Sequence, residues 1–162
     1  MEQFNNLRGR HGFTLIELLV TVAISGVLVG LGVASYNSFN QRQTLNLAVR
    51  GLKTNLWATE VKAVANKQRV PPLTCPNFAG YKVTLDESSY TIVGQCNEEE
   101  FDSESFSLPS NVRKKDPANQ QIIIFKPRTG STNLSLDLVL TYEFISSNTT
   151  ETVTITTTGE IK

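Results

Sequence analysis

Apolar residues are concentrated near the start of the chain, in residues 13–35. This segment contains no proline, and its single charged side chain is Glu17. A helix needs about 20 apolar residues to cross the hydrocarbon core of a bilayer. The segment therefore predicts a membrane-spanning helix. The flank of residues 1–12 carries Arg8 and Arg10, so we expect it in the cytoplasm and the rest of the chain outside.

A secretory signal peptide is the main alternative for this segment. Such a peptide has a shorter apolar core that ends at a small-x-small cleavage site. Here no A-x-A site follows, because the chain continues into Tyr36-Asn37-Ser38-Phe39. We therefore expect the apolar segment to be retained as an anchor.

The helical pattern continues beyond the anchor, over residues 36–70. Apolar residues recur at spacings of four, three and four in a first line: Leu45, Val49, Leu52 and Leu56. A second line extends the pattern beside it: Trp57, Val61 and Val64. Such spacing is typical of an amphipathic helix, and no proline interrupts the chain before Pro71. We expect one helix from about residue 13 to about residue 66, roughly 80 Å long.

After Pro72 the chain changes to short alternating segments bounded by turn residues, which predict strands. The segments are residues 81–85, 90–93, 121–125, 134–144 and 152–158. Residues 86–89 would close a hairpin between the first two, and residues 146–150 would be a loop between the last two. The sequence thus predicts an α+β fold, a long N-terminal helix packed on a mostly antiparallel β-sheet head formed by residues 71–162.

The most specific motif lies where the basic flank meets the anchor: Gly12-Phe13-Thr14-Leu15-Ile16-Glu17. It resembles the cleavage and methylation motif of type IV prepilins and type II secretion pseudopilins. The resemblance implies that residues 1–12 are a leader, which a membrane peptidase removes by cutting between Gly12 and Phe13. The same enzyme would methylate the new amine of Phe13. Glu17 would then face that amine on a neighbouring subunit during assembly.

Glu17 is also a candidate on physical grounds. A carboxylate inside an apolar membrane helix costs a few kcal/mol, so such a residue is functional by default. Cleavage would create a cation at Phe13, and a charge pair in a low dielectric is strong only when both members are present. The pair would reward correct axial register between subunits. The alternative is a single-pass anchor with an incidental glutamate.

The end of the head resembles a narrower group, the H-type minor pseudopilins and the T- and U-type minor pilins. The resemblance lies in the Phe-x-Pro-x-Thr-Gly turn of residues 125–130 and in a closing strand that ends at Gly159. It implies a minor subunit of a pilus or of a type II secretion pseudopilus.

Cys75 and Cys96 are the two cysteines of the chain. The head is predicted to lie outside the cytoplasm, where disulfides form. We expect one bond that closes a loop around the first hairpin and contributes about 3 kcal/mol on the chain-entropy account. Two free thiols are the alternative.

Candidate catalytic chemistry is sparse. The one histidine is His11, in the leader, so the mature chain would have none. Histidine-based triads, general bases and metal sites are thereby excluded. We expect no catalytic residue, no metal, no cofactor and no enzyme activity. The formal net charge is zero, so no global field attracts nucleic acid.

Two charged runs remain. The acidic residues 98–104 could bind Ca²⁺, but their spacing is not that of an EF-hand, and we expect a solvated loop. The basic run of residues 113–115, with Lys126 and Arg128, could bind phosphates. Relatives of the T type bind DNA through a basic C-terminal tail, where this chain has Glu160. We therefore expect a solvated basic loop at residues 113–115 and no DNA partner.

The sequence thus predicts a structural subunit, a minor pilin or minor pseudopilin. Its expected partners are other such subunits, the prepilin peptidase and methyltransferase, the inner-membrane assembly platform, and membrane lipid before assembly. We expect a single-pass inner-membrane protein that moves into a pilus or pseudopilus. A filament-borne DNA-binding minor pilin is the second hypothesis, and a membrane-anchored enzyme is the third.

Overall fold

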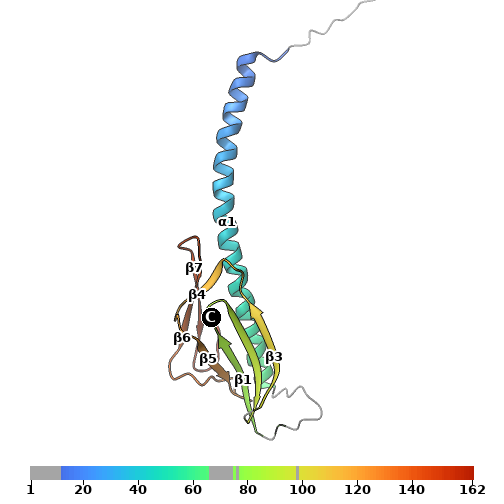
Figure 1. The fold of residues 1–162 in the computed structure, drawn as a ribbon, viewed down its shortest axis with the longest axis vertical. Helices are drawn as coiled ribbons and strands as arrows, with labels where there is room; N and C mark the ends of the chain where they lie inside the picture. The colour runs from blue at the N-terminus through green and yellow to red at the C-terminus, as the bar shows by residue number, and fades with distance from the viewer. Residues whose placement is uncertain (1–11, 66–74, 76, 98) are drawn as a thin grey trace, which may run out of the picture. The chain divides into compact units, whose positions relative to one another are not determined.

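The computed structural model describes residues 12–65, 75, 77–97 and 99–162 (Figure 1). One long helix, α1 (Leu15–Val64), precedes the strands of the head. The predicted leader lies outside the described residues except for Gly12, and so does the predicted helix end beyond residue 65. The chain divides into two units, Met1–Phe39 and Asn40–Lys162.

The first unit consists of the first part of α1. Its sequence is rich in leucine and contains no proline, so nothing interrupts the helical hydrogen bonds. Every large apolar side chain described between Phe13 and Phe39 is exposed, from 47% at Val20 to 83% at Leu15. This unit therefore has apolar surface on all sides and no core of its own.

In the second unit, which we call the globular unit, α1 packs one face against the head. Its buried side chains follow one another at spacings of three and four: Leu45, Val49, Leu52, Leu56, Thr59 and Ala63. The first predicted apolar line is thus confirmed. The second is wrong, because Trp57, Val61 and Val64 are exposed by 62%, 47% and 44%. Trp57 follows Leu56 by one residue and so points about 100° away from it.

Four strands form the first sheet: β1 (Phe78–Leu85), β2 (Ser89–Cys96), β3 (Glu99–Ser107) and β5 (Gln121–Phe125). They are antiparallel, in the order β3-β2-β1-β5 (Figure 1). The predicted hairpin is confirmed, since β1 pairs with β2 up to Leu85 and Tyr90. The predicted strand at residues 121–125 is confirmed as β5.

Three further strands form a second sheet: β4 (Val112–Asp116), β6 (Leu138–Phe144) and β7 (Thr150–Ile155). Their order is β4-β6-β7, again antiparallel. The head therefore has two sheets where the sequence indicated one. The limits predicted for the last two strands are also wrong. Leu136, expected in a strand, precedes β6 and is 79% exposed.

The C-terminal strand is shorter than its alternating pattern predicted, and it begins earlier. It ends at Ile155 because the chain then turns back on itself, with the Thr156 amide donating to the Glu160 carbonyl at 2.9 Å. The Thr157 amide donates to Asp137 Oδ1 at 3.1 Å, and the Glu160 amide donates to Thr156 Oγ1 at 2.9 Å. Such local bonds compete with strand pairing.

The acidic run is also different from the expected loop. From Glu99 onward it forms β3, an edge strand paired with β2, and Glu98 lies outside the described residues. Two aromatic contacts hold it on the sheet. The ring centroids of Phe101 and Tyr81 are 6.1 Å apart, and those of Phe106 and Tyr90 are 4.9 Å apart. Acidic side chains on an edge strand oppose pairing with another chain.

The core of the globular unit lies between α1 and the two sheets. It combines the buried face of α1 with inward side chains of both sheets, among them Tyr81, Val83, Ile123, Leu140 and Tyr142. Alternate residues of each strand supply it, as expected for sheets with one face packed on a core. This packing holds the two sheets and the second part of α1 together.

Candidate functional site

The predicted cleavage position, Gly12 and Phe13, lies just before the first turn of α1. Both residues are exposed and non-helical, Phe13 by 75%. A side chain added at Gly12 would meet no described heavy atom within 4 Å. The fold of the described residues therefore makes no demand for glycine at this position.

Thr14 directly precedes the first residue of α1. It was not singled out by the sequence analysis. Its Oγ1 accepts a hydrogen bond from the Glu17 amide at 3.3 Å, and its carbonyl accepts one from the Leu18 amide at 3.2 Å. A threonine followed three residues later by a glutamate is the signature of a capping box, which satisfies free amides at a helix start. That signature could have identified Thr14 from the sequence.

Glu17 lies in the first helical turn and is exposed. Among the described residues, no cation forms an ion pair with its carboxylate and no group donates a hydrogen bond to it. A carboxylate near a helix N-terminus is favoured by the partial positive charge of the free amides. The side chain is thus compatible with its helix while its charge has no partner cation in the part of the chain that the structure describes.

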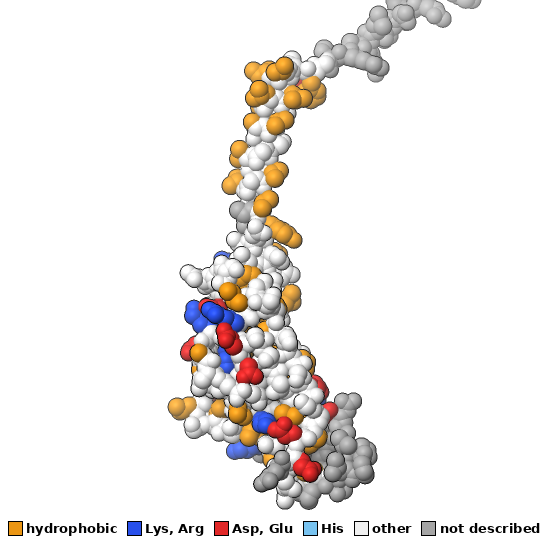
Figure 2. Space-filling model, viewed as in Figure 1, with side chains coloured by type: hydrophobic (Ala, Val, Ile, Leu, Met, Phe, Trp, Pro, Cys, Tyr) orange, Lys and Arg blue, Asp and Glu red, His pale blue; other side chains and the backbone are white. Residues whose placement is uncertain are grey.

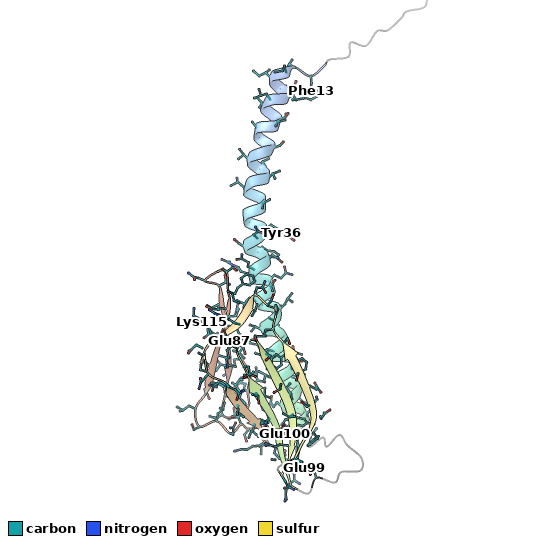
Figure 3. The ribbon with its side chains drawn as sticks, viewed as in Figure 1. Phe13, Tyr36, Glu87, Glu99, Glu100 and Lys115 are labelled. Carbon is teal, nitrogen blue, oxygen red and sulfur yellow. A yellow bond between two sulfur atoms is a disulfide. The ribbon has the colours of Figure 1, made fainter. Side chains whose placement is uncertain are left out.

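The helix that carries these residues is long and apolar enough to cross a membrane. Its most apolar 18-residue window has a mean hydropathy of 2.3 and is not buried within the molecule. Figure 2 shows apolar side chains along the first part of α1. Figure 3 labels Phe13, just before this helix, and Tyr36 within it. A surface of this kind needs lipid or another apolar surface around it.

Comparison with known proteins agrees with this geometry. The family model of the prokaryotic N-terminal methylation motif matches residues 7–33. The chain therefore carries a prokaryotic N-terminal methylation motif. Two fimbrial proteins of Pseudomonas aeruginosa are 30% identical to it over 83 residues. The aligned part is 51% of this chain and 53% of each relative, so the chain spans about half of their length. No solved structure matches the chain.

The pilin-like fold class expected from the sequence is confirmed. It consists of one long N-terminal helix and antiparallel strands, in an α+β arrangement. The matched motif and the order of helix and strands therefore both agree with the resemblance seen in the sequence.

The predicted disulfide between Cys75 and Cys96 is present. The two Cα atoms are 5.7 Å apart, and the residues are 21 apart in sequence. Cys96 is the last residue of β2, so the bond closes a loop around β1 and β2 as expected. Two free thiols are thereby excluded.

The basic run of the pilin-like head is not a solvated loop, contrary to expectation. It forms β4, whose side chains alternate between the two faces of the second sheet. Arg113 and Lys115 lie on the outer face. Arg113 Nε and one terminal nitrogen each contact Glu143 Oε1 at 2.8 Å, and Lys115 Nζ contacts Glu143 Oε2 at 2.8 Å. These contacts lower the pKa of Glu143. The hydrogen bond from Lys115 has the largest effect, and the one from Arg113 comes next.

Lys114, between these two cations, faces inward and is 2% exposed. Its Nζ donates to the Leu85 carbonyl at 2.8 Å and to the Asn119 carbonyl at 2.9 Å. Burial lowers the pKa of Lys114, and the charges of Asp86 and Glu87 partly oppose that effect. The carbonyl contacts explain how an ammonium group is tolerated inside the head, because a buried charge must be hydrogen-bonded.

Lys126 and Arg128, the other basic residues of the predicted patch, are exposed on the turn after β5. Among the described residues, no group of three histidine, cysteine, aspartate or glutamate side chains is arranged to hold a metal ion. Two acidic side chains of β3 contact lysines: Glu104 contacts Lys62 at 2.8 Å, and Glu100 contacts Lys82.

Proposed function

We propose that this chain is a structural subunit of a type IV pilus or a related pseudopilus, not an enzyme. One observation carries the proposal: a methylation motif, residues 7–33, covers the start of a helix whose large apolar side chains are all exposed as far as Phe39. A helix of this kind suits a membrane before assembly and a bundle of similar helices afterwards. Its partners would be other subunits, a prepilin peptidase and methyltransferase, and an inner-membrane assembly platform.

The proposed processing is a cut between Gly12 and Phe13, followed by methylation of the Phe13 amine. Since the fold of the described residues makes no use of glycine at position 12, recognition by the peptidase is the reason we give for it. The exposed, non-helical backbone there would let an enzyme reach the bond. Residues 1–12 would stay in the cytoplasm and the head outside, with α1 crossing the inner membrane once.

Glu17 is the proposed assembly residue. Its carboxylate has no cation partner among the described residues, and cleavage would create a cation four residues earlier. In an apolar surrounding, an unpaired carboxylate is costly and a paired one is not. The Phe13 amine of a neighbouring subunit would supply the pair and so select the correct register.

A second surface supports assembly through α1. In the globular unit, Leu47, Trp57 and Val61 are exposed on α1 outside its buried face. Trp57 and Val61, four residues apart, lie next to each other on the helix and indicate a contact surface. A neighbouring subunit's apolar helix would cover it in a filament.

We place the chain with the minor pilins or minor pseudopilins on the resemblance of residues 125–130 and of the closing strand. The DNA-binding alternative is less well supported than the sequence indicated. Lys114 is buried, and Arg113 and Lys115 share Glu143, whereas binding to DNA draws on many free cations.

The experiment is expression of the chain with a prepilin peptidase in a filament-forming host. Mass spectrometry should find a methylated Phe13 as the first residue, and Gly12→Val should keep the leader attached. Glu17→Val should be cut normally but should be lost from sheared filaments, because the pairing carboxylate is gone. Thr21→Val, a neutral change in the same helix, is the matched control.

Two results would contradict the proposal. An intact Met1, or a first residue other than Phe13, would remove the processing step. Equal amounts of wild type and Glu17→Val in sheared filaments would remove the assembly role of Glu17.

A further inference from the structure

A cluster of charged side chains in the head has no part in the proposed assembly. It surrounds a cavity of about 250 Å³. The lining residues come from the turn between β1 and β2, from β4 and the loop after it, and from β6: Glu87, Arg113, Lys114, Lys115, Ala118 and Glu143. Glu87 and Lys115 lie close together in Figure 3, and Figure 2 shows basic and acidic side chains gathered on the visible face of the globular unit.

Two cations of this cluster share one carboxylate. Glu143, whose side chain is 11% exposed, contacts Arg113 through one oxygen and Lys115 through the other. The cations are much more open, with side chains 45% and 53% exposed. Glu143 therefore fixes a guanidinium and an ammonium side by side while leaving several of their N–H groups free.

Arg113, Lys115 and Glu143 together carry one positive charge that they do not neutralise among themselves. Arg113 and Lys115 are the cations on the outer face of β4, and Glu143 is the carboxylate that they share. Glu87 is 3.5 Å from Arg113 and 64% exposed, so it is a weak partner. Lys114 faces the other side of β4, where its ammonium donates to carbonyls inside the head, so its charge is not available to a ligand on the outer face. The cavity thus suits a ligand with a single negative charge.

The cluster lies at the end of the head nearest to Asn40. Lys62 of α1 lies over Tyr81, 5.9 Å from its ring centroid, and Asn55 donates to Tyr90 Oη at 2.7 Å. The turn between β1 and β2, next to Tyr90, therefore lies closer along α1 to Asn40 than Tyr81 does. Glu87 lies in that turn, and its carbonyl accepts from the Lys114 amide at 2.8 Å. Glu99 and Glu100 lie at the other end (Figure 3).

Asn40 is the point where the chain enters the globular unit from the apolar segment. We propose that Arg113 and Lys115 bind the phosphodiester of an anionic phospholipid headgroup while the subunit is held in the membrane. This inference rests on the membrane anchoring in the proposed function. The anchor keeps headgroups at high local concentration, so a single weak site is enough. Leaving the membrane for a filament then includes release of this lipid.

A phosphodiester fits better than a nucleic acid. It carries one negative charge, which balances the one uncompensated charge of the cavity. Arginine and lysine both recognise phosphate oxygens, arginine through a planar fork and lysine as a point charge. DNA presents a dense row of phosphates and is bound through several of them.

The test uses the full chain in nanodiscs of phosphatidylcholine alone, or of phosphatidylcholine and phosphatidylglycerol in equal amounts. The reactivity of each lysine with an acetylating reagent is measured by mass spectrometry. Lys115 should react roughly fivefold more slowly in the mixed discs, the effect expected for one cation at an anionic surface. Lys126, exposed on the turn after β5, should not change.

Matched variants separate the site from general attraction. Arg113→Gln should abolish the protection of Lys115, and Arg113→Lys should keep it, which also distinguishes loss of charge from loss of fold. Arg128→Gln removes the same charge elsewhere in the head and should keep the protection.

Equal reactivity of Lys115 in the two kinds of disc overturns the headgroup site. So does protection of Lys115 by inorganic phosphate or duplex DNA in phosphatidylcholine discs when phosphatidylglycerol gives none. A chain that does not migrate with the discs contradicts the membrane anchor and with it both proposals. A chain that does so, with Lys115 unprotected, contradicts only the site proposed here.

Discussion

Gly94 on β2 leaves room for the ring of Phe101, which lies directly over it on the neighbouring strand. A Cβ at this position would be 2.3 Å from Phe101 Cζ and 2.5 Å from Cε2. Phe101 in turn lies against Phe78 and Tyr81. The missing side chain is therefore what allows an acidic strand to be held by its aromatic residue.

Gly94→Ala should destabilise the globular unit by about 1–3 kcal/mol, the usual cost of forcing an extra group into a packed region. The control is Gly51→Ala on α1, where an added Cβ meets no atom within 4 Å. That change should stabilise the unit by about 0.5–1 kcal/mol, because alanine favours a helix interior. Chemical denaturation followed by near-UV circular dichroism measures both. Equal stability of Gly94→Ala and wild type would contradict the packing.

At the residue scale, the sequence predicted Gly12, Phe13 and Glu17 as the candidates because their spacing is specific. It gave no indication that Lys114 is buried. Three consecutive basic residues indicate solvent exposure, but in a strand alternate residues face opposite sides. The middle cation therefore entered the head, where carbonyls of distant segments receive it.

At the scale of the element, α1 in the globular unit has two apolar faces with different roles. The buried face, which includes Leu52, packs on the head. The other carries Trp57 at 62% exposure. The sequence predicted both sets on the stripe that packs on the head, and only the first is buried there, because periodicity alone does not say which face meets the head. Thr59 and Ala63, small residues of weak hydrophobic signal, decide it by continuing the buried face.

Leu52→Ala should cost about 2–5 kcal/mol, because it opens a cavity at a fully buried position. Trp57→Ala should change the stability by less than about 0.5 kcal/mol, as an exposed substitution does. Its effect should be seen instead in the amount of subunit recovered in sheared filaments, which should fall. Loss of stability in Trp57→Ala, with normal recovery in filaments, would show that Trp57 serves the head and not assembly.

The strands were predicted where apolar residues alternate in dense runs, as in β1, β2 and β5. They were misplaced or missed where the decisive contacts are distant in sequence. β3 depends on Phe101 and Phe106 reaching rings of the first hairpin. β4 depends on pairing with β6, some 30 residues later, with Arg113 beside Glu143. No local pattern contains these partners.

At the scale of the whole molecule, the two units differ in whether they have a core of their own. The first has no core, so its behaviour depends on its surroundings. The second has a continuous core and a covalent closure of its own. The order of apolar helix, amphipathic helix and β-rich head could be predicted from composition along the chain. The split of the head into two sheets could not, because it is set by which strand edges meet.

Because the disulfide lies entirely in the globular unit, its removal should affect that unit and leave the anchor unchanged. Cys75→Ser with Cys96→Ser should lower the free energy of unfolding of the head by about 3 kcal/mol, since the unfolded chain regains the entropy of an open loop. Denaturation followed by near-UV circular dichroism measures this loss, and reduction of the wild type should reproduce it. Migration of the variant with nanodiscs should equal that of the wild type, because no cysteine lies in residues 13–39. A variant that unfolds like the wild type would show that the loop is already held by its packing, and a variant that leaves the discs would show that the two units depend on each other.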